Sequence, residues 1–144
     1  MPGSDLQRFV IAQDAGGTFD RAMRELTEGR KQSHWMWFVF PQIAGLGSSP
    51  MARRYSLASL DEAAEYLTHP ILGPRLLEAT EAVLHVHDTT AIGVFGTVDA
   101  MKLRSSMTLF HRADPDEPLF EQVLEQFFAG TPDAATDVVI AKGG

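Results

Sequence analysis

Glycine and proline interrupt this chain so often that few of the segments between them are longer than a short helix. The 144 residues include 12 glycines and 8 prolines. Between these interruptions, apolar residues recur at helical spacing. Positions 19, 22, 23 and 26, which are all apolar, follow the pattern i, i+3, i+4 and i+7. The ranges expected to be helical are 5–15, 18–29, 59–67, 74–87, 91–95, 97–110 and 118–130.

These ranges predict a fold class that is mainly α. The length fits a single compact domain over residues 1–144, with about six short helices and room for a minor strand element. We expect residues 1–4 and 142–144 to be flexible, because chain ends are ordered only where something ties them down.

Segment 33–40 is the stretch whose conformation the pattern leaves open. Six consecutive apolar residues, from Trp35 to Phe40, suit a buried strand. Ser33 as a cap and Pro41 as a terminator would equally bracket a two-turn helix. A strand needs a partner, and the only similar run is 138–140, so we favour the helix.

The composition is that of a soluble globular protein, with 44% hydrophobic and 22% charged residues. No run approaches the roughly 18 apolar residues that a membrane span requires, so no membrane partner is expected. No secretory signal is visible at the start of the sequence. Cysteine is absent, which excludes disulfides and thiolate chemistry and fits a reducing compartment. We therefore expect a cytoplasmic protein.

The charges are unevenly distributed along the chain. The net charge of −7 argues against general nucleic-acid binding, which depends on many basic residues. Two windows, 29–60 and 100–113, nevertheless contain no Asp or Glu. If these windows meet in space, they would form a local positive site for a small anion. They hold Arg30, Lys31, Arg53, Arg54, Lys102, Arg104 and Arg112, seven of the twelve basic residues.

Segment 31–42 combines both tryptophans with polar and basic neighbours, a combination that can line a pocket. His34 is the candidate catalytic acid or base, or a donor to a ligand phosphate. Its alternative role is structural, with the ring bonded to a backbone carbonyl. The tryptophans would either stack on a flat ligand or fill the core. The ligand-binding residues expected in this segment are Lys31, Ser33, Trp35, Trp37 and Gln42.

Two further groups could form the rim of this pocket. Arg53, Arg54 and Tyr55 follow a loop rich in Gly and Ser, and arginine pairs bind phosphate or carboxylate well, although a solvated loop would look the same. Serines are unfavourable inside a helix, so those in the 97–110 helix suggest either ligand contacts or close helix packing. The candidate ligand-binding residues in that helix are Lys102, Arg104, Ser105 and Ser106.

No metal site or cofactor is expected. Asp99, Asp114 and Asp116 could bind a metal only if other ligands converged on them, and the acidic stretch 114–118 suits the entry of a helix. His85 and His87 are badly spaced for a shared helical face. The sequence contains no P-loop, dinucleotide-binding or His-Glu-x-x-His motif.

Five segments of the sequence resemble an uncharacterised bacterial family, domain-of-unknown-function family 1810. The segments are 5–9, 29–42, 52–55, 69–76 and 102–110, and together they extend over nearly the whole chain. The resemblance implies a mostly helical single domain and supplies no established activity. Some relatives are labelled calpastatin, but a folded aromatic-rich domain has little in common with a disordered protease inhibitor.

The residue pattern and the charge map suggest a function in small-molecule binding. We expect a basic, aromatic-walled pocket that binds a small anionic, phosphate-bearing or nucleotide-like molecule, and that turns it over if His34 acts as acid or base. Whether the protein is an enzyme stays open, and a protein partner is unknown. The alternative is a protein-interaction module that uses an exposed aromatic patch at 33–40. A third possibility is that 33–40 is purely a core segment.

Overall fold

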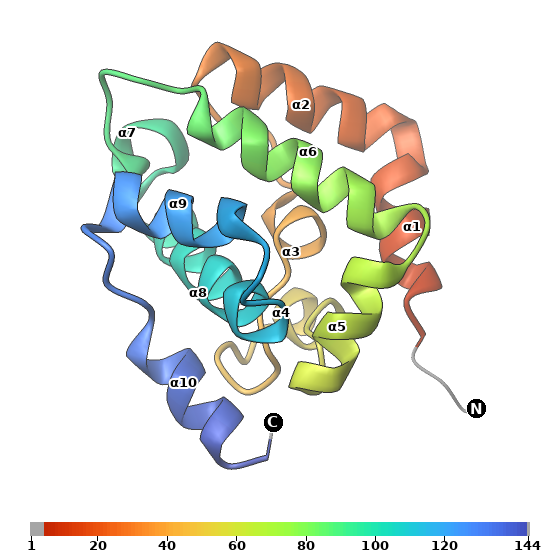
Figure 1. Ribbon diagram of the computed structural model, residues 1–144. Helices are drawn as coiled ribbons and strands as arrows, with labels where there is room; N and C mark the ends of the chain where they lie inside the picture. The colour runs from red at the N-terminus through yellow and green to blue at the C-terminus, as the bar shows by residue number, and fades with distance from the viewer. Residues whose placement is uncertain (1–4, 144) are drawn as a thin grey trace.

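The computed structural model describes residues 5–143, and every regular element in that range is a helix (Figure 1). The predicted fold class, mainly α, is confirmed. None of the helices formed by these residues is long and apolar enough to cross a membrane. The elements are α1 (Gln7–Asp14), the 3₁₀ turn η1 (Ala15–Gly17), α2 (Thr18–Glu28), α3 (Met36–Val39), α4 (Pro50–Arg54), α5 (Leu60–Thr68), α6 (Leu72–Leu84), α7 (Ala91–Phe95), α8 (Thr97–Ala113), α9 (Pro118–Phe128) and α10 (Ala134–Ala141).

Several helix ends use the signals that the sequence displays. The hydroxyl of Ser59 accepts a hydrogen bond from the N–H of Glu62 at the start of α5 (3.1 Å). α2 ends at Gly29, whose φ of 75° is the left-handed conformation that glycine adopts without strain. Gly96, with φ of 81°, separates α7 from α8. These helix ends were predictable from the sequence, because each depends on the conformational or hydrogen-bonding preference of the residue at that position.

Other helix starts differ from the prediction. α1 begins after Leu6 rather than after a capping Asp5, and α2 begins at Thr18 with Gly17 in the cap position. α6 begins at Leu72, two residues before Pro74. The side chain of His69 caps this helix, because its Nδ1 accepts from the N–H groups of residues 71 and 72 (3.1 and 3.2 Å).

α8 is the central helix, and it packs against α5, α7, α9 and α10. α2 and α6 lie side by side and cover one side of the molecule (Figure 1). The buried apolar residues form one cluster, and its large aromatic members come from elements far apart in the chain. The fully buried large aromatic side chains are Phe9, Trp35, Phe40, Tyr66, Phe110 and Phe120.

Segment 33–40 contains a short helix and no strand. Only Met36–Val39 is helical, which is one turn rather than two, and Trp35 rather than Ser33 occupies the N-cap position. Within residues 5–143, β pairing is limited to one isolated parallel bridge between Ile43 and Leu57. The run 138–140, considered as a strand partner, lies within α10.

No helix was expected after residue 130, yet residues 134–141 form α10. Asp133 caps this helix by accepting from the N–H of Thr136 (3.1 Å). The guanidinium of Arg112 binds both carboxylate oxygens of Asp137 (2.9 and 3.0 Å) and ties α10 to α8. Residues 142 and 143 form a turn after α10, whereas the expected flexibility of 1–4 and 144 lies outside the described residues.

Candidate functional site

Glu25 is a buried carboxylate on the apolar face of α2, and it organises the irregular segment before α3. The residue is 7% exposed. Its Oε1 accepts hydrogen bonds from the N–H groups of Gln32 (2.8 Å) and Ser33 (3.0 Å) and from the indole Nε1 of Trp35 (2.9 Å). Its Oε2 accepts from the hydroxyl of Ser33. Four donors from 32–35 are therefore fixed to α2 by a single side chain.

The charge state of Glu25 follows from these contacts. Burial alone raises the pKa of the carboxyl, but the hydrogen bonds from Ser33, Gln32 and Trp35 outweigh it and lower the pKa from 4.5 to about 2. Sequence reasoning missed this residue. A signal was present, because Glu25 lies three residues after Ala22 on the apolar face of α2, where a carboxylate needs partners.

Lys31 and Lys102, one from each acid-free window, meet at the same carboxylate. The Nζ of Lys31 lies 2.8 Å from Oδ2 of Asp99, and the Nζ of Lys102 lies 3.7 Å from Oδ1. The side chain of Lys31 is 7% exposed and also donates to the carbonyl oxygen of Ser33 (2.6 Å). The two windows thus meet in space, and Asp99, which borders the second window, balances one of the two charges.

Lys102 lines an open groove of about 290 Å³ between segment 42–46, α8 and α10. The Nζ of Lys102 lies 4.4 Å from the ring centroid of Trp37, close enough for a cation–π contact. The carboxylate of Asp133 also lines the groove, but it accepts from the hydroxyls of Ser105 (3.0 Å) and Thr136 (2.6 Å). Other lining residues are Gln42, Leu46, Val98, Met101 and Ser105.

The two tryptophans have different environments. Trp35 is fully buried, with its indole N–H bound to Glu25 and the ammonium of Lys31 5.0 Å from its ring centroid, so its ring is closed to a ligand. Trp37 is half-buried. It lines a cavity of about 10 Å³ together with Gln42 and the buried Tyr55, which is room for about one water molecule.

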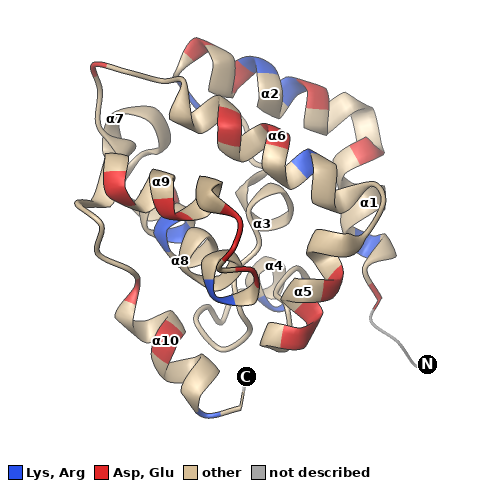
Figure 2. Cartoon of the chain, viewed as in Figure 1, with Lys and Arg blue, Asp and Glu red and all other residues tan. Residues whose placement is uncertain are grey.

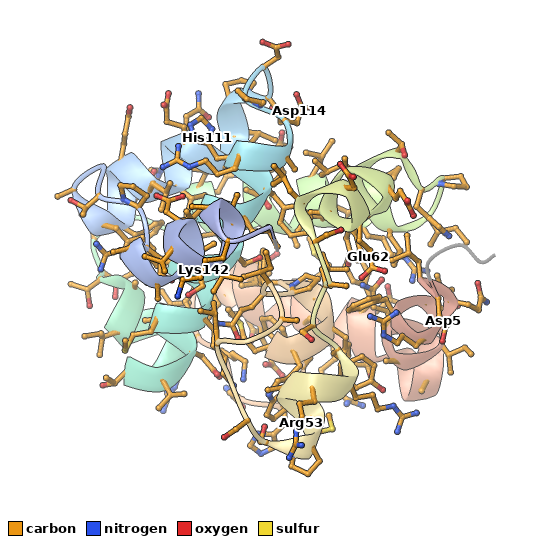
Figure 3. All side chains as sticks on the ribbon, turned by 90° about the horizontal axis from the view of Figure 1, so that it is seen from below. Asp5, Arg53, Glu62, His111, Asp114 and Lys142 are labelled. Carbon is orange, nitrogen blue, oxygen red and sulfur yellow. The ribbon has the colours of Figure 1, made fainter. Side chains whose placement is uncertain are left out.

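The structure does not bring His34, Arg53 and Arg54 to the groove. His34 is exposed, and its side chain makes no hydrogen bond to any of residues 5–143 that would orient it. Arg53 lies on the exposed α4 at the outer edge of the molecule (Figure 3). The guanidinium of Arg54 lies 5.4 Å from the ring centroid of Tyr55, its own neighbour.

The two serines of α8, Ser105 and Ser106, are buried. Ser105 donates to Asp133, while Ser106 is fully buried in the core, and its hydroxyl finds no partner among the described residues. The Nε of Arg104 donates to the carbonyl oxygen of Thr131 (2.9 Å), and neither of these residues lines the groove of Lys102. Of the two reasons considered for these serines, the contacts of Ser105 match close helix packing.

The assembled groove provides the ammonium of Lys102, the carboxylate of Asp133, the amide of Gln42 and apolar walls. His34, the acid–base candidate, is not among its lining residues. Among residues 5–143, no group of three or more His, Cys, Asp or Glu side chains is placed to hold a metal ion. Figure 2 shows acidic positions on α5, α6, α9 and α10, and basic positions on α2 and α8.

The structure is a mainly helical domain with an open surface groove, and Lys102 is among the residues that line it. The chain belongs to the family described as a protein of unknown function, DUF1810, whose model matches residues 3–140. The resemblance found in the sequence is therefore confirmed. A crystal structure of the conserved hypothetical protein Rv1873 from Mycobacterium tuberculosis is similar, with 47% identity and a TM-score of 0.92 over 95% of this chain and 96% of that chain. No curated protein matches the chain.

Proposed function

We propose that this protein binds a small molecule carrying a phosphate or carboxylate in the groove lined by Lys102. One observation supports this proposal most directly. The ammonium groups of Lys31 and Lys102 share the single carboxylate of Asp99, so these three residues retain one positive charge, while the carboxylate of Asp133 in the same groove accepts from Ser105 and Thr136. Lys31 is buried with its partners, and the ammonium that faces the groove is that of Lys102. A cytoplasmic location in a bacterium is part of the same proposal, and cell fractionation tests it.

The groove suits a ligand with one anionic group and an apolar or planar body. Lys102 and the amide of Gln42 would contact the anion. Leu46, Val98 and Met101 would contact the apolar part, as in small-molecule sites that combine apolar walls with a few polar groups. A nucleoside monophosphate or a sugar phosphate has these features.

The residues that line the groove are suited to binding the ligand rather than to catalysing a reaction of it. An acid or base must lie within hydrogen-bonding reach of the reacting proton, and His34 is exposed away from the lining residues. The alternative function, an exposed aromatic patch at 33–40, has little support because Trp35, Phe38 and Phe40 are buried and only His34 in that segment is exposed.

Calorimetric titration with inorganic phosphate, AMP and uncharged adenosine tests this proposal. We expect AMP to bind more tightly than adenosine, with an affinity that falls as salt rises. Lys102→Gln is expected to weaken AMP binding about tenfold, since hydrogen bonds to charged groups contribute about 1.5–3 kcal/mol. Arg24→Gln, the same charge change at an exposed position on α2, is the matched control and should leave binding unchanged.

The proposal fails if AMP and adenosine bind equally. It also fails if Arg24→Gln weakens AMP binding as much as Lys102→Gln does, because the effect would then come from overall charge. Trp37 provides an independent signal, since its ring lies against Lys102. Quenching by AMP that persists in Trp37→Phe would place the ligand elsewhere.

A further inference from the structure

Exposed apolar side chains gather on α7 and the first half of α8. The described residues include six large hydrophobic side chains that are exposed, and three of them lie within ten positions: Ile92 (59%), Val98 (66%) and Met101 (65%). The other three are scattered. Single exposed apolar residues are ordinary, but a cluster of them marks a surface that binds something.

Ile92 and Met101 border a second groove, and of its described lining residues Met101 alone also lines the groove of Lys102. This groove lies between α7, α8 and α9 and has a volume of about 400 Å³, within the range of small-molecule sites. Phe127 and Phe128 form its opposite wall. Among the described residues that line it, Arg104 alone carries a charge.

Arg104 is held in a position that suits an anion. Its Nε donates to the carbonyl oxygen of Thr131 (2.9 Å), and its guanidinium carbon lies 5.9 Å from the ring centroid of Phe128. The terminal nitrogens have no hydrogen-bond partner among residues 5–143, and Arg104 is one of the residues that line the groove. A guanidinium already fixed in place loses less side-chain entropy when it binds a carboxylate through two parallel hydrogen bonds.

We propose that the groove between α7, α8 and α9 binds a small amphiphilic carboxylate, with the carboxylate on Arg104 and the apolar chain against Met101, Ile92 and the two phenylalanines. One cation within a lining that is otherwise uncharged and mostly apolar matches a ligand with one negative charge and an apolar body. A second copy of the chain fits less well, because a two-fold contact through this face would set the cations of α8 against those of the partner copy.

Titration with decanoate, followed by NMR of ¹³C-labelled methionine methyl groups, tests this site. Met101 borders both grooves, so the variants described next assign its shift to one of them, while Met36 and Met107 are buried and serve as internal references. We expect a saturable shift of the Met101 signal with decanoate. Acetate, which lacks the apolar chain, and decylammonium, which carries the opposite charge, should produce no saturable shift at the same concentrations.

Two variants locate the ligand. Arg104→Gln is expected to weaken decanoate binding about tenfold or more, whereas Lys102→Gln should leave it unchanged, which separates this site from the first groove. Since Arg104→Gln also removes the bond to Thr131, Ile92→Asp is the second variant. It places a negative charge at an exposed rim position without touching that bond, and it should abolish binding. The proposal would be overturned by an equal Met101 shift with decylammonium or by no Met101 shift with decanoate. Full decanoate affinity in Arg104→Gln or in Ile92→Asp would also overturn it.

Discussion

Replacement of Glu25 by glutamine tests the most unusual feature of the interior. The carboxylate accepts four hydrogen bonds from residues 32–35. A glutamine of the same shape has one acceptor oxygen, so if this oxygen replaces Oε1, the amide N–H groups replace the acceptor of the Ser33 hydroxyl. At least part of this network is then lost inside the protein, so we expect Glu25→Gln to lower the free energy of unfolding by about 2–4 kcal/mol.

The pKa of Glu25 gives an independent magnitude. A fall from 4.5 to about 2 corresponds to about 3 kcal/mol of stabilisation at neutral pH. Because the pKa is lower in the folded state, this stabilisation is present above the ordinary value of 4.5 and is lost as the pH falls towards about 2. The difference in free energy of unfolding between the wild-type protein and Glu25→Gln should therefore shrink as the pH falls across that interval.

Urea unfolding followed by tryptophan fluorescence, repeated from neutral to acid pH, measures both quantities. Glu28→Gln is the matched control, since Glu28 is exposed on the same helix, and its cost should stay below about 0.5 kcal/mol. The reasoning is refuted if Glu25→Gln costs no more than Glu28→Gln. If the difference in free energy of unfolding between wild type and Glu25→Gln does not narrow at acid pH, the proposed link between stability and the protonation of Glu25 is refuted.

Two further predictions concern the scaffold. Gly73→Ala should cost about 3 kcal/mol or more by thermal unfolding, because its Cβ would lie 2.1 Å from the carbonyl oxygen of Leu67. Gly16→Ala, with nothing within 4 Å and a φ of 61°, should cost only about 1–2 kcal/mol, and an equal cost for both would contradict the clash. Asp137→Asn should speed hydrogen exchange in α10 and cost at most about 1 kcal/mol, because the pair with Arg112 is partly exposed. The hydrogen bond from Arg112 lowers the pKa of Asp137, so the stabilisation from this ion pair is lost as the pH falls below the ordinary carboxyl range. If Asp137→Asn left the exchange rates in α10 unchanged, the ion pair would not stabilise that helix.

The helical fold was predictable because most of its helices carry local signals. The cap at Ser59 and the glycine stops at Gly29 and Gly96 depend on residues adjacent to the helix they bound. α10 was missed although Asp133 and Thr136 have the spacing of a cap. The conformation of 33–40 was not predictable in the same way, because the contacts that hold residues 32–35 come from Glu25 on a preceding helix.

The candidate site was partly predictable from the charge map. The absence of acidic residues in two windows pointed to Lys31 and Lys102, which meet at Asp99. The same map could not separate Arg53, which remains on the surface, from the lysines of the cluster. Nor could the sequence show that Arg104 faces a different groove from Lys102, because that depends on the rotation of α8 against α9 and α10.

The contacts of Glu25 have a consequence for how the protein opens. Segment 29–35 forms no helix or strand, so it has no regular series of backbone hydrogen bonds that could break one after another. The amides of Gln32 and Ser33 and the indole of Trp35 instead end on the same carboxylate. When that carboxylate moves away, all of these donors lose their acceptor together, so residues 32–35 open as one cooperative unit and not by gradual fraying. Lys31 keeps its own bonds to Asp99 and to the carbonyl oxygen of Val94.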